Sequence, residues 1–113
     1  MKLPSAENAA IAPAKIRDYL LSTSHPIGRF KAPFFAGLGY TIANWRRLEQ
    51  DFLSLAVSGD AQLGKDSPYG QKYEIRGTLS GPSRRSGEVL TVWIIPFGSV
   101  VPQFVTAFPG ELT

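Results

Sequence analysis

The chain has 113 residues, a net charge of +3 and no cysteine, and 43% of its residues are hydrophobic. This length fits one domain that buries a core without disulfides or metals, and the apolar content excludes a disordered chain. The lack of cysteine excludes disulfide frameworks, thiolate zinc sites and cysteine nucleophiles. The mild positive charge suits an anionic partner but is far below that of a dedicated nucleic-acid-binding tail.

Hydrophobic spacing predicts two regular helices in the first half of the chain. The first begins at Pro13, because proline suits the first helical turn, and ends at Ser22-Thr23-Ser24. The other covers about residues 45–58, after Asn44 as its N-cap and before Gly59. One face of this helix is apolar and is expected to be buried: Trp45, Leu48, Phe52, Leu55 and Ala56.

A further helix is predicted between these two, after Ser24 as its N-cap. Pro33 removes a backbone donor, so the helix is either kinked there or starts near Ala32. Its buried side is expected to be aromatic and aliphatic: Phe30, Phe34, Phe35 and Leu38.

The apolar period changes to two after a polar loop at 60–70. We expect one strand around Tyr73–Leu79, a hairpin loop at 81–87, an apolar strand at 88–95 and a last strand at 103–108. Helices followed by a β-meander predict an α+β fold, with N-terminal helices packed on one face of a C-terminal antiparallel sheet.

The organisation predicted from these elements is a single domain over residues 1–113. Its helical part is expected at about 13–58 and its sheet part at about 71–108. No apolar run has the length of a signal peptide or a membrane span, so we expect a cytoplasmic protein without membrane contact.

Several kinds of chemistry are poorly supported by the residues present. One histidine, no cysteine and scattered carboxylates do not form a metal-binding pattern, and no cofactor is expected. Gly37-Leu38-Gly39 follows a helix rather than a strand, so it is a helix terminator and not a phosphate loop. A nucleophile elbow of the Gly-x-Ser-x-Gly type is absent.

What remains is metal-free acid–base chemistry around His25, the single histidine. Its imidazole exchanges protons near neutral pH, and Arg29 and Lys31 follow closely as candidate phosphate-binding cations.

Cations and hydroxyls on the strands complete this hypothesis. If one sheet face is free of helices, polar residues line it: Lys72, Glu74, Arg76, Thr78, Thr91, Trp93 and Thr106. Such a face suits an RNA phosphodiester, because cations neutralise the developing charge and a flanking aromatic such as Tyr73 stacks a base. The reaction would be attack of a 2′-hydroxyl on the adjacent phosphate.

Each of these residues also has an ordinary structural interpretation. A lone histidine before a proline is often a capping or surface residue, and Arg29 and Lys31 are then simply solvated. Alternating charges on a strand are typical of any sheet with one wet face. Thr91 and Thr106 are common strand formers, and Trp93 suits a core.

Longer motifs resemble an uncharacterised bacterial domain family, found as small stand-alone proteins and as toxin C-terminal modules. The resemblance covers nearly the whole chain. Its motifs are Glu7-Asn8-Ala9, Lys15-Ile16-Arg17-Asp18-Tyr19-Leu20-Leu21, His25-Pro26-Ile27-Gly28-Arg29-Phe30-Lys31, Phe34-Phe35, Leu38-Gly39-Tyr40, Tyr69-Gly70-Gln71-Lys72-Tyr73 and Phe104-Val105-Thr106-Ala107-Phe108-Pro109.

The order of elements and the last strand are also similar, more loosely, to the barnase–colicin–RelE class of ribonuclease toxins. That similarity implies His25, Lys31, Arg76 and Thr106 as catalytic residues. Beside them, the residues predicted to bind the substrate are Arg29, Lys72, Tyr73 and Thr91. Modest charge and a single histidine depart from the strongest members of the class.

Three functions follow as hypotheses. The first is a metal-independent ribonuclease toxin that a small antitoxin or immunity protein neutralises, and it requires His25 and Arg76 to converge on one cleft. The second is a non-catalytic antitoxin, immunity or adaptor module. Partners of basic nucleases tend to be acidic, and this chain is basic, which favours the nuclease over this second hypothesis. The third is RNA binding without cleavage.

Overall fold

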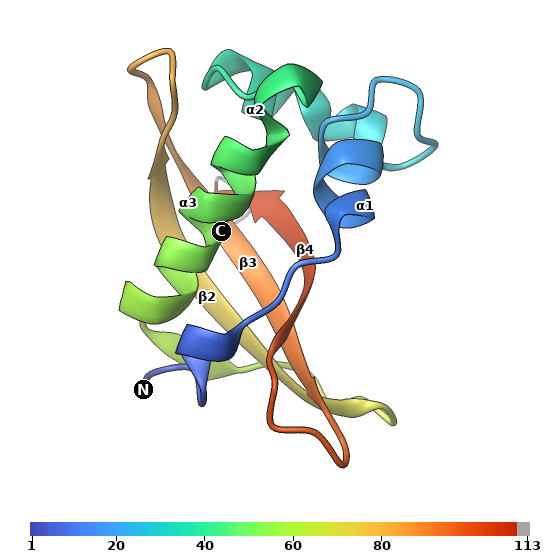
Figure 1. Ribbon diagram of the computed structural model, residues 1–113, viewed down its shortest axis with the longest axis vertical. Helices are drawn as coiled ribbons and strands as arrows, with labels where there is room; N and C mark the ends of the chain where they lie inside the picture. Colours follow the sequence, from blue (N-terminus) through green and yellow to red (C-terminus); the bar gives the residue numbers. More distant parts are fainter. Residues whose placement is uncertain (111–113) are drawn as a thin grey trace.

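Helices come first along the chain and a four-stranded antiparallel sheet follows (Figure 1). The computed structural model describes residues 1–110. The helices are α1 (Pro13–Lys15), which continues as a wide π turn (Ile16–Leu20), α2 (Ala32–Gly37) and α3 (Trp45–Ser58). Short 3-10 turns lie at Ala6–Asn8, Gly28–Phe30 and Ile42–Asn44. The predicted α+β class is confirmed.

The sheet has the simple order β1-β2-β3-β4, with each strand antiparallel to its neighbour. The strands are β1 (Ala61–Leu63), β2 (Gly70–Ser80), β3 (Ser86–Pro96) and β4 (Gln103–Pro109). The prediction of a plain loop at 60–70 was wrong at β1. This strand has only three residues, and such a short segment gives no periodic signal.

A β-bulge interrupts the pairing of β3 with β4. Val92 pairs with Thr106 and Trp93 pairs with Phe104, so Val105 is the extra residue. Bulges bend a strand and re-aim its side chains, and they are common near functional sites.

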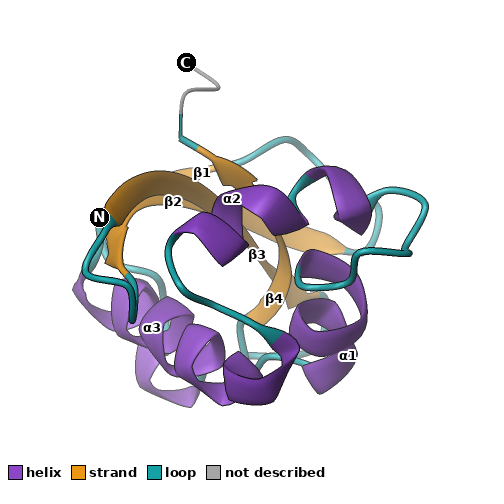
Figure 2. Cartoon of the chain, turned by 90° about the horizontal axis from the view of Figure 1, so that it is seen from above, coloured by secondary structure: helices purple, strands orange, loops and turns teal. Residues whose placement is uncertain are grey.

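The helices pack on one face of the sheet, where the core lies (Figure 2). Phe52 of α3 stacks on Phe104 of β4 at 5.0 Å, and Phe104 meets Trp93 edge-on at 5.3 Å between ring centroids. The apolar face predicted for 45–58 is confirmed at its centre, because Leu48, Phe52 and Ala56 are 0% exposed.

Two predictions of burial were wrong. Phe30 is 73% exposed, because the turn Gly28–Phe30 ends before α2 begins and points this ring outward. Thr91 was considered for the free face of the sheet, yet it is 0% exposed on the helix-covered face. Trp93 is also 0% exposed there, which confirms its alternative interpretation as a core residue. Thr91 donates to the Ile75 carbonyl at 2.9 Å and accepts from Trp93 Nε1 at 2.9 Å.

The segment before α1 runs along β4 and fixes where the first helix lies (Figure 1). Ala10 forms a parallel bridge with Gln103: its N–H donates to the Pro102 carbonyl, and its own carbonyl accepts from Phe104 N–H, both at 2.9 Å. The chain then turns into α1 at Pro13, beside the free edge of β4.

Thr91→Val tests the buried hydroxyl. We expect a loss of about 1–3 kcal/mol in the free energy of unfolding, because the Trp93 indole N–H is left buried without an acceptor. Urea unfolding measures it. The matched control is Thr78→Val on the exposed side of β2, which should change stability by no more than about 0.5 kcal/mol. Equal effects at the two positions would contradict the role of the hydroxyl.

Candidate functional site

Three side chains from distant parts of the chain meet beside β4. The Lys31 ammonium donates to the Tyr19 hydroxyl at 2.8 Å and to the Thr106 hydroxyl at 3.1 Å. Thr106 Oγ1 in turn lies 3.4 Å from the Tyr19 hydroxyl, to which it donates. The ammonium also lies 4.2 Å from the centroid of the Phe108 ring. The cluster therefore joins the π turn, the segment before α2 and the last strand.

Gly28 makes this convergence possible. A Cβ atom at this position would lie 1.9 Å from the carbonyl oxygen of Tyr19, so only glycine allows the two backbones to approach this closely. The 3-10 turn then delivers Lys31 to the Tyr19 hydroxyl.

His25 holds the same turn by its own side chain. Its Nδ1 atom accepts hydrogen bonds from the backbone N–H groups of Ile27 and Gly28, both at 3.0 Å. A backbone N–H can only donate, so Nδ1 carries a lone pair and the neutral ring has its proton on Nε2. The ring also meets Tyr19 edge-on at 4.9 Å. The capping interpretation of this histidine is thus confirmed.

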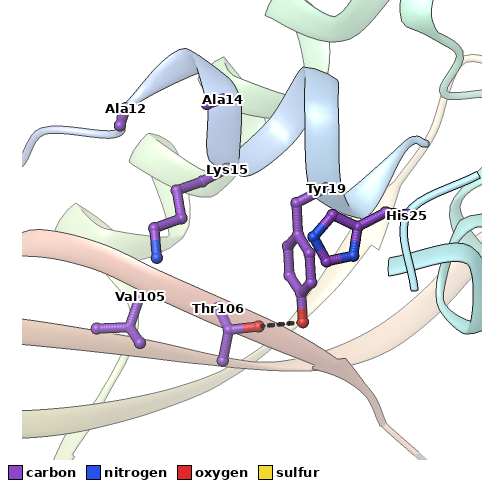
Figure 3. Close-up of a pocket in the computed structure, with 7 residues that line it drawn as sticks. All are labelled: Ala12, Ala14, Lys15, Tyr19, His25, Val105 and Thr106. Carbon is purple, nitrogen blue, oxygen red and sulfur yellow. Dashed lines mark hydrogen bonds between the residues drawn. The ribbon is translucent and has the colours of Figure 1, made fainter. Parts of the chain in front are cut away.

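A pocket of about 390 Å³ opens at the cluster, between α1 and β4 (Figure 3). Tyr19 and His25 lie side by side at one end of it, and Lys15 reaches in from the other end. The pocket is lined by Ala12, Ala14, Lys15, Tyr19, His25, Val105 and Thr106.

The pKa of the Tyr19 hydroxyl is lower than its ordinary value. Partial burial alone would raise this pKa, but the hydrogen bonds from Lys31 and Thr106 and the charges of Lys31 and Lys15 outweigh it. The Tyr19 oxygen accepts two hydrogen bonds, one from Lys31 and one from Thr106. What remains for a group in the pocket is the O–H proton of the phenol or the third lone pair of the phenolate. Tyr19 is therefore equipped to transfer a proton there.

Three of the four predicted catalytic residues are brought together: His25, Lys31 and Thr106. Arg76 is not. It lines a separate hollow with Asp60 and Glu74, and its guanidinium donates to the Gly110 carbonyl at 3.4 Å. The expected convergence of His25 and Arg76 on one cleft was wrong, because two strands separate Arg76 from the β4 edge where His25 lies.

The predicted substrate-binding residues are dispersed. Lys72 lines a hollow of about 240 Å³ on the outer face, which Thr106 also borders. Arg29 lies elsewhere, with its guanidinium 4.7 Å from the Phe30 ring centroid. Tyr73 and Thr91 are buried on the helix side, 9% and 0% exposed, so neither ring nor hydroxyl can contact a substrate on the free face.

Sequence reasoning missed Tyr19 and Lys15. Tyr19 falls at helical spacing with Ile16 and Leu20, which is typical of a core position, and a lysine such as Lys15 on the same helix is typical of its solvent side. One signal in the sequence could have pointed to Tyr19. The hydroxyl of a tyrosine at the margin of an apolar face needs a polar partner, which indicates polar groups nearby.

Among residues 1–110, no group of three or more histidine, cysteine, aspartate or glutamate side chains is placed to hold a metal ion. Within the same range no helix is long and apolar enough to cross a membrane.

A model of the family described as "Domain of unknown function (DUF6883)" matches residues 2–111. The chain belongs to this family. A search of curated proteins found no match. A chain from a solved "Contact-dependent growth inhibition toxin - immunity protein complex from Klebsiella pneumoniae 342" is similar to this DUF6883 domain, with a TM-score of 0.68 and 18% identity over 92% of this chain and 95% of that chain. At this identity the likeness shows a shared fold.

Lys31→Met should raise the Tyr19 pKa, because it removes a hydrogen bond and a nearby positive charge while burial remains. Phenolate absorbance against pH measures the shift, with the signal of Tyr19→Phe subtracted to isolate this tyrosine. Lys72→Met is the control, since Lys72 makes no contact with Tyr19, and it should leave the titration in place. A Tyr19 titration that Lys31→Met does not move would contradict the assignment.

Gly28→Ala should lower the free energy of unfolding by about 1–3 kcal/mol, because the methyl group collides with the Tyr19 carbonyl. Thermal or urea unfolding measures it. Gly37→Ala is the matched control, because nothing lies within 4 Å of the added Cβ atom in α2. It should be neutral or slightly stabilising. Equal losses in the two variants would rule out the close approach as the cause.

Proposed function

We propose that this chain is a metal-independent ribonuclease toxin of a toxin–immunity system. The observation that carries the proposal is that Tyr19, His25 and Thr106 line one pocket between α1 and β4. The Lys31 ammonium donates to the hydroxyls of Tyr19 and Thr106. The fold shared with a chain of a toxin–immunity complex supports the toxin context. In this proposal Tyr19 replaces Arg76 as the fourth catalytic residue.

The proposed reaction is transesterification of RNA. The substrate's 2′-oxygen forms a bond to the adjacent phosphorus, and the bond from phosphorus to the 5′-oxygen breaks. Tyr19 gives its proton to that leaving oxygen, and Lys31 and Thr106 stabilise the phenolate that results. The proton of the 2′-hydroxyl passes to water. The products end in a 2′,3′-cyclic phosphate and a 5′-hydroxyl.

His25 has a narrower role than general base. Its Nδ1 lone pair is occupied by the two backbone N–H groups, so neutral His25 offers the pocket a donor at Nε2 and no acceptor. In the proposed mechanism Nε2–H donates to a non-bridging phosphate oxygen, while the capping bonds keep Lys31 in place. Lys15 supplies a further positive charge across the pocket.

A second candidate is a non-catalytic immunity or adaptor module. The observations that favour it are that Arg76 lies apart from the site and that His25 is engaged in capping its own turn. The similar chain comes from a complex named for both a toxin and an immunity protein, so the shared fold alone fits either role.

Tyr19→Phe should reduce RNA cleavage by about 10²–10⁴-fold, because it removes the proton donor and leaves the ring in place. Cleavage of a labelled RNA in the presence of a chelator measures this effect. Tyr69→Phe is the control, since Tyr69 is 78% exposed and outside the pocket, and it should cleave as the wild type does. Wild-type cleavage by Tyr19→Phe would remove the proposed mechanism. A wild-type chain that neither cleaves RNA nor arrests growth would favour the immunity role.

His25→Asn separates the two roles of the imidazole. The amide oxygen of asparagine can accept the bonds that Nδ1 accepts, but the substituted side chain lacks the Nε2–H donor. We expect stability close to wild type and cleavage lowered about tenfold, which corresponds to one hydrogen bond of about 1.4 kcal/mol. His25→Ala should lose stability as well. Full cleavage by His25→Asn would reduce the histidine to a structural cap.

A further inference from the structure

Two hollows on either side of β4 share two lining residues. The pocket between α1 and β4 and the hollow of about 240 Å³ on the outer face are both bordered by Val105 and Thr106. This sharing follows from the bulge, because the extra residue Val105 turns two successive side chains toward the same region. The two hollows therefore adjoin at Val105 and Thr106, and together they are here named the β4 groove.

Three lysines line the β4 groove, with Lys15 at the α1 end and Lys65 and Lys72 at the β2 end. A fourth, Lys31, contacts two of the lining residues: its ammonium donates to Thr106 and lies over the Phe108 ring. The ion pairs within residues 1–110 are Arg17–Asp18 and Arg47–Asp51, so these four lysines have no carboxylate partner in that range. One carboxylate, that of Glu74, lines the β2 end.

We propose that the β4 groove binds a single strand of RNA over at least three successive phosphates. The scissile phosphate lies at Tyr19 and Thr106, one flanking phosphate at Lys15 and another at Lys65 and Lys72. The proposal rests on the proposed function for the choice of RNA. A groove that combines lysines with aromatic rings such as Phe108 is suited to an unpaired strand, whose bases are free to stack; a duplex keeps its bases stacked on each other.

The test uses the double variant Lys65→Gln, Lys72→Gln and two labelled probes. Binding of an octanucleotide that carries 2′-deoxy sugars, and so cannot be cleaved, should weaken about tenfold. The slope of log affinity against log salt should fall by about 0.7, for one lost phosphate contact on a single strand. Cleavage of a diribonucleotide, which has one phosphodiester and fills only the α1 end, should stay at the wild-type rate.

The matched control is Arg84→Gln, Arg85→Gln, which removes the same charge from the exposed β2–β3 hairpin tip. It should leave the octanucleotide affinity within about twofold of wild type. Equal weakening in the two double variants, or a parallel fall in diribonucleotide cleavage, would overturn the flanking site. So would an RNA duplex that binds as tightly as the single strand.

Glu74→Gln provides a test of opposite sign. Removing the negative charge from the hollow that the two lysines line should tighten octanucleotide binding several-fold, and unchanged or weaker binding would contradict the proposal. Failure of the proposed function is distinguishable, because the binding probe needs no cleavage. If the wild-type chain binds the octanucleotide through Lys65 and Lys72 but cuts no RNA, the groove stands and the nuclease does not.

Discussion

The site depends on the ammonium group of Lys31, which ties the helical half of the chain to the last strand. Its two hydrogen bonds reach Tyr19, twelve residues away, and Thr106, seventy-five residues away. A half-buried ammonium needs such acceptors, because an unpaired charge removed from water is costly. The same contact that holds the two halves together therefore sets the acidity of the phenol, so assembly of the fold and the chemistry of the pocket are linked.

The engagement of His25 limits which chemistry the pocket can perform. An imidazole with a free Nδ1 atom is a versatile acid or base, whereas this ring uses that atom to order its own turn. In the proposed mechanism the proton transfer falls to the Tyr19 hydroxyl, whose pKa the cluster lowers. Of the four residues that the barnase–colicin–RelE resemblance implied, His25, Lys31 and Thr106 lie near one another, and Arg76 lies apart from them.

Features that depend on residues close together in the sequence were predicted well, and features that depend on contacts between distant residues were not. The helix Trp45–Ser58 and the three longer strands have clear periodicity and were placed closely. Thr91 lies on the buried face, where its hydroxyl donates to the Ile75 carbonyl of the neighbouring strand, and strand alternation alone did not reveal this. The pairing of Tyr19 with Thr106 depends on a backbone approach at Gly28 and on the bulge at Val105. Neither of these leaves a local pattern.

The first ten residues connect the two outer strands. The Met1 carbonyl accepts from Ala61 N–H of β1 at 2.6 Å, and Ala10 pairs beside β4. Between them Leu3 and Ala6 enter the core, so the segment crosses the sheet on its helical side. Exposed strand edges invite pairing with strands of other molecules, which leads to aggregation. A segment that occupies part of both edges, beside a first strand of only three residues, reduces the backbone that is left free for such contacts.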